Sequence, residues 1–183
     1  MEVLLIDANY LKRVTNLNGA VDEATLPPAI IAAQDISIQM YTGSDLLDKL
    51  KADAQAGTLA GAYKTLVDDY LRKALAWLVM EELLPSLYVQ IENGGLVIRS
   101  AEGTTAISET ELQREVDRAR NKAKFYLSQM CNYMSYNSAS LPEYGTNVYN
   151  RISAKSFSYH IGGLHIGGGR NARGYQKDIY STR

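Results

Sequence analysis

The sequence predicts a mainly α protein: a helical bundle with a small β-hairpin and a long extended C-terminal arm. From Ala62 to Leu84 the apolar residues repeat a three-then-four spacing, which places them on one face of a helix. A second long segment, Leu112 to Tyr136, is also periodic, whereas the last part of the chain is glycine-rich and has no apolar period. We therefore expect a helical domain over residues 1–136, with the hairpin near 87–99, and an extended, glycine-rich, basic arm over 137–183.

Length and charge limit the classes of protein to consider. The chain has 183 residues, 46% hydrophobic and 21% charged, which is typical of one globular domain with a core. The net charge of the chain is -1. The segment from Arg151 onward contains six lysines or arginines and one acid, a net charge of +5, so the first 150 residues carry -1 minus 5, or -6. This balance gives no general case for binding nucleic acid or an anionic membrane.

The apolar segments are too short for targeting or membrane insertion. The N-terminus has an acid at position 2 and a short apolar run, which is not the pattern of a signal peptide. No window approaches the ~20 apolar residues of a membrane helix. The lone Cys131 excludes an internal disulfide, fits a reducing compartment, and is expected to be a small buried hydrophobe rather than a reactive thiol. We expect a cytoplasmic protein.

The first third of the chain carries helix boundaries that can be read directly. Val3 to Ile6 is a strand or the lead-in to a helix, and Asp7 is a suitable N-cap for a turn that begins at Ala8. Pro27 and Pro28 favour a helix start, and Gly43 is expected to close that helix. The next helix has Ser44 as its N-cap and ends at Gly57.

The helix from Ala62 to Leu84 is the organising element of the prediction. Its polar face carries lysines, arginines and acids, and Pro85 is expected to stop it because proline lacks an N–H and clashes with the preceding turn. The expected apolar stripe consists of Tyr63, Leu66, Val67, Tyr70, Leu71, Ala74, Leu75, Leu78 and Val79. Such a stripe needs other helices to cover it.

A hairpin and a second long helix follow. Val89 and Ile91 alternate with polar residues before an Asn-Gly-Gly turn, the pattern of a β-hairpin, and Ser108 with Glu111 forms a capping box. The later helix has a heptad stripe of Leu112, Val116, Ala119, Ala123, Tyr126, Met130 and Tyr133. This stripe can pack within its own bundle, which we favour, or against a neighbouring subunit, for which Val116, Ala123 and Met130 are the interface candidates.

No catalytic or metal-binding arrangement is recognisable, and we expect neither enzyme activity nor a cofactor. His160 and His165 lack further ligands nearby, and the run GGLHIGGGR lacks the ending of a phosphate-binding loop. Basic residues on the later helix offer an alternative function, a nucleic-acid-binding accessory protein that uses this helix face and the tail, although interspersed acids argue against it. These residues are Arg114, Arg118, Arg120, Lys122 and Lys124.

The segment from Leu4 to Leu50 resembles the N-terminal part of head-tail connector proteins of tailed bacteriophages, the adaptor or ring proteins beneath the portal. The similarity lies in Tyr10-Leu11-Lys12-Arg13, an acidic turn around Asp22, the helix Pro28 to Gln39 with Ala33-Gln34-Asp35, and Gly43 before Leu46-Leu47. The two long helices fit the same plan. Among such phages, those infecting Bacteroides and relatives, including crAss-like phages, are the most similar. The tail matches no motif of the family.

The resemblance implies a structural virion protein without enzyme activity. It implies a homo-oligomeric ring of about 12 copies in the neck, which binds the portal protein and the next tail or neck ring protein and encloses the DNA channel, with DNA only as channel contents and no membrane partner. It places the protein in the virion and, during assembly, in the host cytoplasm. The basic, aromatic tail then suits an arm that becomes ordered on a partner, rather than a tail with no fixed contacts. Its expected anchors are Tyr159, Arg170, Arg173, Tyr175 and Tyr180.

Overall fold

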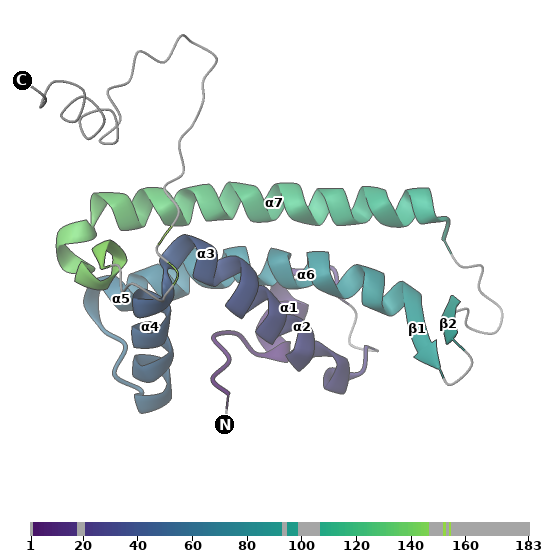
Figure 1. The fold of residues 1–183 in the computed structure, drawn as a ribbon, viewed down its shortest axis with the longest axis horizontal. Helices are drawn as coiled ribbons and strands as arrows, with labels where there is room; N and C mark the ends of the chain where they lie inside the picture. Colours follow the sequence, from purple (N-terminus) through teal and green to yellow (C-terminus); the bar gives the residue numbers. More distant parts are fainter. Residues whose placement is uncertain are drawn as a thin grey trace, which may run out of the picture.

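The computed structural model describes residues 2–17, 21–92, 95–98, 107–146, 152 and 154. This part of the chain consists mainly of helices, so the mainly α class is confirmed (Figure 1). The elements are α1 (Ala8–Val14), η1 (Glu23–Thr25), α2 (Leu26–Ala32), η2 (Ala33–Ile38), α3 (Gln39–Thr42), α4 (Ser44–Ala56), α5 (Gly61–Thr65), η3 (Leu66–Leu71), α6 (Arg72–Tyr88), β1 (Val89–Glu92), β2 (Gly95–Ile98), α7 (Glu109–Tyr136), η4 (Ser138–Ser140) and η5 (Pro142–Gly145).

Two long antiparallel helices form the spine of the molecule. The segments α5, η3 and α6 follow one another without a break, and α7 returns along their length (Figure 1). The expected stripe on α5–α6 is buried or half-buried, but Ala76, Met80 and Leu83 are buried as well. The α5–α6 helix is therefore covered on more than one side, because other helices pack on it besides α7.

The apolar side of α7 packs on α6 within the same chain. Val116, Ala123 and Met130, the expected subunit-interface candidates, are 5%, 1% and 0% exposed. Their expected role at a subunit interface is therefore wrong, because side chains covered by their own fold are not available to a neighbour. The buried positions of α7 are Val116, Ala119, Ala123, Leu127, Met130, Cys131 and Met134.

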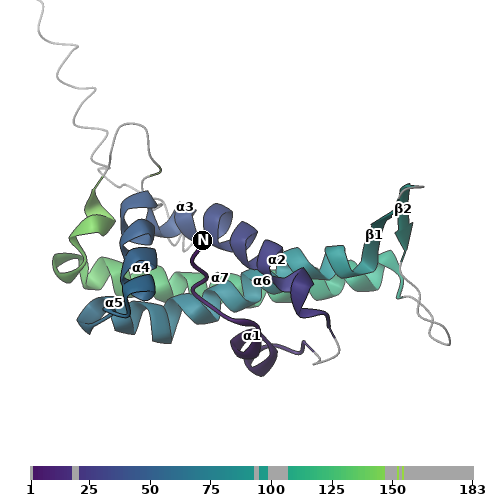
Figure 2. The ribbon, with the colours of Figure 1, turned by 90° about the horizontal axis from the view of Figure 1, so that it is seen from below.

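Shorter helices cover the sides of α6 that α7 leaves open, and α3 also contacts α7 (Figures 1 and 2). The continuous helix α2–η2–α3 crosses α6, and α1 and α4 flank it. Gln34, fully buried in η2, holds the N-terminal segment in place: its Nε2 donates to the Val3 carbonyl at 3.0 Å, and its Oε1 accepts from the Leu5 N–H at 3.1 Å. Val3 to Ile6 thus belongs to no helix or strand, yet Leu5 and Ile6 are buried in the core.

The antiparallel strands β1 and β2 follow α6, with Val89 opposite Ile98 and Glu92 opposite Gly95. The turn residues Asn93 and Gly94 lie outside the described residues. Pro85 does not stop α6, contrary to expectation: the helix continues to Tyr88. Proline at this position removes only the hydrogen bond to the Glu81 carbonyl, one turn before the helix ends, and the burial of Leu83 holds this last part of the helix on the core.

The body of the molecule extends past the boundary expected at 136. The short helices η4 and η5 follow α7 directly and fold back against α4. Leu141 between them is 0% exposed, and Tyr144 packs against the same core. A segment that buries a leucine in the core is part of the domain, so an arm that starts at residue 137 is wrong, and the packed unit continues at least to Thr146.

Candidate functional site

The described residues hold no metal-binding cluster. No group of three or more His, Cys, Asp or Glu side chains in this part of the chain is placed to bind a metal ion. His160 and His165 lie outside it. Cys131 is buried, as expected, and burial raises the pKa of its thiol to about 11, so at neutral pH it is protonated and a poor nucleophile. None of the described helices is both long enough and apolar enough to span a bilayer.

The chain after Thr146 returns to the corner between α3 and α4. The Ser44 N–H donates to the Ile152 carbonyl at 2.9 Å, and the Ile152 N–H donates to Ser44 Oγ at 3.2 Å. Ser44 is buried, and its Oγ also accepts from Gln39 Nε2 at 2.8 Å. We call this contact of residues 152 and 154 with the α3–α4 corner the arm root. It fixes the point from which the remaining tail starts.

Two further polar contacts hold the segment before the arm root. The Tyr63 hydroxyl donates to Glu143 Oε2 at 2.6 Å, and the Thr146 hydroxyl donates to Asp45 Oδ2 at 2.6 Å. Burial raises the pKa of Tyr63 to about 12, and the hydrogen bond to Glu143 acts in the same direction because it favours the protonated phenol. The segment is therefore fastened to both α4 and α5.

The residues expected to anchor the arm lie beyond the described part of the chain. They are Tyr159, Arg170, Arg173, Tyr175 and Tyr180. The arm root, which sequence reasoning missed, involves the Gly43-Ser44 pair that the sequence assigned only to helix ends. The structure shows why this corner holds a glycine: Gly43 has φ +77°, and a Cβ there would lie 3.1 Å from the Ala154 nitrogen and 3.3 Å from the Ile152 carbonyl oxygen.

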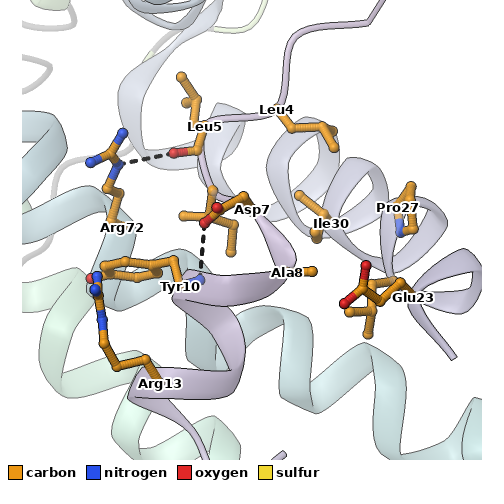
Figure 3. Close-up of a pocket in the computed structure, with 12 residues that line it drawn as sticks. Leu4, Leu5, Asp7, Ala8, Tyr10, Arg13, Glu23, Pro27, Ile30 and Arg72 are labelled. Atoms are coloured by element: carbon orange, nitrogen blue, oxygen red, sulfur yellow. Dashed lines mark hydrogen bonds between the residues drawn. The ribbon is translucent and has the colours of Figure 1, made fainter. Parts of the chain in front are cut away.

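A pocket of about 470 Å³ opens between the N-terminal segment, α1, α2 and α6 (Figure 3). Leu4, Pro27 and Ile30 supply apolar walls, and Figure 3 shows Arg13 and Arg72 on either side of Tyr10 at one end. Asp7 and Glu23 also line this pocket, and Asp68 pairs with Arg72, so nearby acids balance the charges of the two arginines.

The polar groups of this pocket are held by the backbone around them. Arg72 Nε donates to the Leu5 carbonyl at 3.0 Å, and Arg72 Nη1 pairs with Asp68 Oδ1 at 2.8 Å. Asp7 Oδ1 accepts from the Tyr10 N–H at 2.9 Å. Burial raises the pKa of Tyr10, partly opposed by Arg72 and Arg13. Tyr10 therefore stays a neutral hydrogen-bonding group at physiological pH.

Two grooves flank α7. One, of about 540 Å³, lies between α6, α7 and the segment after α1, where Lys122 Nζ stands 3.8 Å from the centre of the Trp77 ring. Its lining is Asn16, Leu17, Val21, Trp77, Met80, Leu84, Glu115, Arg118, Ala119 and Lys122. Trp77, the single tryptophan of the chain, lies outside the expected apolar stripe of its helix. A large aromatic residue at such a position indicates a second packing surface on the helix, and here that surface is this groove.

The other groove, of about 210 Å³, lies between α3, α6 and α7. Its lining is Ser37, Met40, Tyr41, Leu78, Glu81, Arg120, Ala123, Lys124 and Leu127. Ile36, on the neighbouring helix surface, is 63% exposed. Grooves with an apolar floor and a charged rim on both sides of one helix are typical of protein-binding surfaces.

Comparison with known proteins adds one finding about ancestry. No curated protein and no solved structure matches the chain. A family model, the family of unknown function DUF6712, matches residues 38–154. The match covers more than half of the 183 residues, begins at the end of η2 and stops at the arm root. The chain therefore belongs to the family of unknown function DUF6712.

Proposed function

We propose that the chain is a structural subunit of the neck of a tailed phage. Many copies would form a ring that joins the portal to the next tail component and continues the DNA channel. The resemblance of residues 4–50 to head-tail connector proteins suggests this function. A compact helical body with a tail attached at one fixed point suits it, because such a body serves as a wedge in a ring while the tail reaches another component.

The observation that carries the proposal is the arm root. Ile152 is fixed at the α3–α4 corner by two hydrogen bonds, one from the Ser44 N–H and one to the Ser44 hydroxyl, and Ala154 lies beside Gly43, so the tail is attached to the body at a defined place. The whole segment from Arg151 has a net charge of +5, against -6 for the preceding residues. A basic, tyrosine-bearing arm is complementary to an acidic surface on a neighbouring subunit or on the portal.

A closed ring also needs two different lateral surfaces on each subunit. Val116, Ala123 and Met130 do not serve, because they are buried. We place the lateral contacts at the two grooves beside α7, one at Trp77 and one near Met40 and Ile36. These grooves lie on opposite flanks of the same helix, as head-to-tail packing requires.

Of the five basic residues of α7 on which the nucleic-acid-binding alternative depends, three already have partners within the chain. On α7, Arg118 pairs with Glu115, and Arg120 binds Glu81 at 2.7 Å and Asp117 at 3.1 Å. Lys122 lies over the Trp77 ring. Cations that already face acids or an aromatic ring are poor candidates for phosphate contacts.

Quantitative mass spectrometry of purified virions tests the proposal. The copy number of this chain, relative to the portal protein, is expected to equal the portal's or to be a small multiple of it. Absence from the virion would overturn the proposal. In that case, DNA affinity of the isolated full chain that falls steeply with salt would favour the accessory-protein alternative.

A further inference from the structure

The solvent-facing side of α7 changes character halfway along the helix. Residues 109–124 include nine charged residues, whereas residues 125–136 include none. In this second half the exposed residues are Phe125, Gln129, Asn132, Ser135 and Tyr136. The spacing of Phe125, Gln129, Asn132 and Tyr136 places these four on one face, opposite the side that packs on α6.

This uncharged face of α7, defined by those five residues, exposes large aromatic groups. Phe125 is 59% exposed and Tyr136 91% exposed. The cores of protein interfaces are depleted of charged residues and enriched in aromatic ones, whereas ordinary helix surfaces are charged, as the first half of α7 is. The contrast within a single helix points to a covering segment over the second half.

The chain itself contains a segment of matching chemistry. Residues 156–169 carry no formal charge, with both histidines neutral, and they contain Phe157, Tyr159, Ile161, Leu164 and Ile166 among glycines and serines. Phe157, Tyr159 and Ile161 alternate with Ser158 and His160, so an extended chain would present the three large side chains on one side. The basic residues of the tail follow only from Arg170 onward.

The arm root brings this segment to the correct part of the molecule. Ser44, which binds Ile152, follows Met40 and Tyr41 closely in sequence across the bend at Gly43, and these two line the groove with Lys124 and Leu127 of α7. An extended chain spans about 3.3 Å per residue, and the uncharged face is about 16 Å long at 1.5 Å per helical residue. Residues 156–169 therefore have enough length to reach the face and lie along it.

We propose that residues 156–169 of the same chain dock on the uncharged face of α7, leaving the basic end from Arg170 to Arg183 to reach a partner. Docking within one chain is favoured because the tether gives the segment a high effective concentration next to the face. Apolar contact with Phe125 and Tyr136 opposes the entropy lost by ordering a glycine-rich segment. The inference concerns the single chain and does not depend on ring formation.

Site-specific photo-crosslinking in the full chain tests it. A benzophenone amino acid replaces Phe125 in one variant and Arg114 in a matched control variant. Position 114 lies about three turns before position 125 on the same face of α7. After illumination, the crosslinked peptides are mapped in a mixture of isotopically light and heavy protein. The expected result is adducts from position 125 to residues 156–169 of the same isotopic label, in a monomeric band, and few such adducts from position 114.

Three results would overturn the inference: adducts between light and heavy chains, adducts to residues 170–183 or to the body, and adduct yields at position 125 no higher than at position 114.

A second variant combines Phe157→Asp with Ile161→Asp in the position-125 background. The yield of adducts from position 125 to residues 156–169 is expected to fall about tenfold, since burying a carboxylate against the uncharged face of α7 is unfavourable. An unchanged yield would also contradict docking. Circular dichroism confirms that each variant is folded.

Discussion

Gly43 occupies a corner where both the backbone angle and the surrounding space demand glycine. Its φ is +77° and its ψ is 163°, a conformation almost restricted to glycine. The atoms nearest to an added Cβ belong to residues 152 and 154, which are backbone groups of the arm root and cannot swing away like a side chain. The arm root therefore depends on a residue with no side chain.

Gly43→Ala is expected to destabilise the protein by roughly 2–3 kcal/mol, from backbone strain plus displacement of the arm root. Thermal unfolding should report this as a lower midpoint, at about 2–4 °C per kcal/mol for a chain of this size. Gly57→Ala is the matched control: Gly57 has φ +68° with nothing within 4 Å of an added Cβ. Equal losses in the two variants would show that the arm root does not press on Gly43.

The Tyr63–Glu143 hydrogen bond gives a prediction about alkaline pH. The folded pKa of Tyr63 is raised from 10.0 to about 12, so the unfolded chain loses the phenol proton first as the pH rises. The stabilisation is therefore fully present below pH 10 and is lost between pH 10 and about 12. Tyr63→Phe removes this contribution.

Chemical denaturation at a series of alkaline pH values measures the effect. The stability of the unsubstituted protein is expected to fall more steeply across this range than that of the Tyr63→Phe variant, which should also be less stable at neutral pH by about 1 kcal/mol. Parallel pH profiles would show that Tyr63 does not titrate through this contact.

At the scale of elements, the sequence predicted some helix ends and missed others. α6 continues past Pro85 to Tyr88, and the N-cap of α4 is Gly43, with Ser44 the first residue of that helix. Asp7 caps α1 and Ser108 with Glu111 forms a capping box at α7, because these contacts involve neighbours within three residues. The π-helical segments η2 and η3 were not predicted. They arise from how whole helices fit together, which local patterns do not encode.

The heptad interpretation of α7 is correct only for its first half. After Ala123 the buried side chains are Leu127, Met130, Cys131 and Met134. Of the expected stripe only Met130 is among them, and Tyr126 and Tyr133 are half-buried. A straight helix drifts relative to a strict seven-residue repeat, and the tyrosines at its edge can satisfy their hydroxyls there. Tyr133 does so by donating to the Ala62 carbonyl at 3.2 Å. The candidate grooves and the arm root depend on contacts distant in sequence and could not be predicted.

Met130→Ala tests whether the α7 stripe belongs to the core of a single chain. Met130 is 0% exposed, so its truncation is expected to cost about 2–5 kcal/mol of unfolding free energy. Asn121→Ala, at an exposed position of the same helix, should stay within about 0.5 kcal/mol. Denaturant unfolding at two protein concentrations provides the measurement. A loss that depended on concentration would instead indicate an interface between subunits.

For the whole molecule, the division between body and tail is the property that most affects function. The family match and the described contacts both end at Ala154, and residues 138–146 close the end of the core near α4 and α5. The sequence placed the division at 136 because the apolar periodicity ends there. Leu141 and Tyr144 then join the core as single side chains on short turns, which no periodic pattern reveals.

Two truncated chains distinguish these boundaries. Residues 1–154 keep every described contact, so this chain is expected to unfold within about 1 kcal/mol of the full protein, since a glycine-rich segment contributes little net stability. Residues 1–136 lose the burial of Leu141 and the hydrogen bond from Tyr63 to Glu143, together worth about 3 kcal/mol. Thermal unfolding of the full chain and the two truncated chains gives the comparison.

If the two truncated chains unfolded at the same temperature, the segment from 137 to 154 would not be part of the body. If residues 1–154 folded normally but no longer joined the particle, the tail would be the part of the chain that binds the neighbouring component.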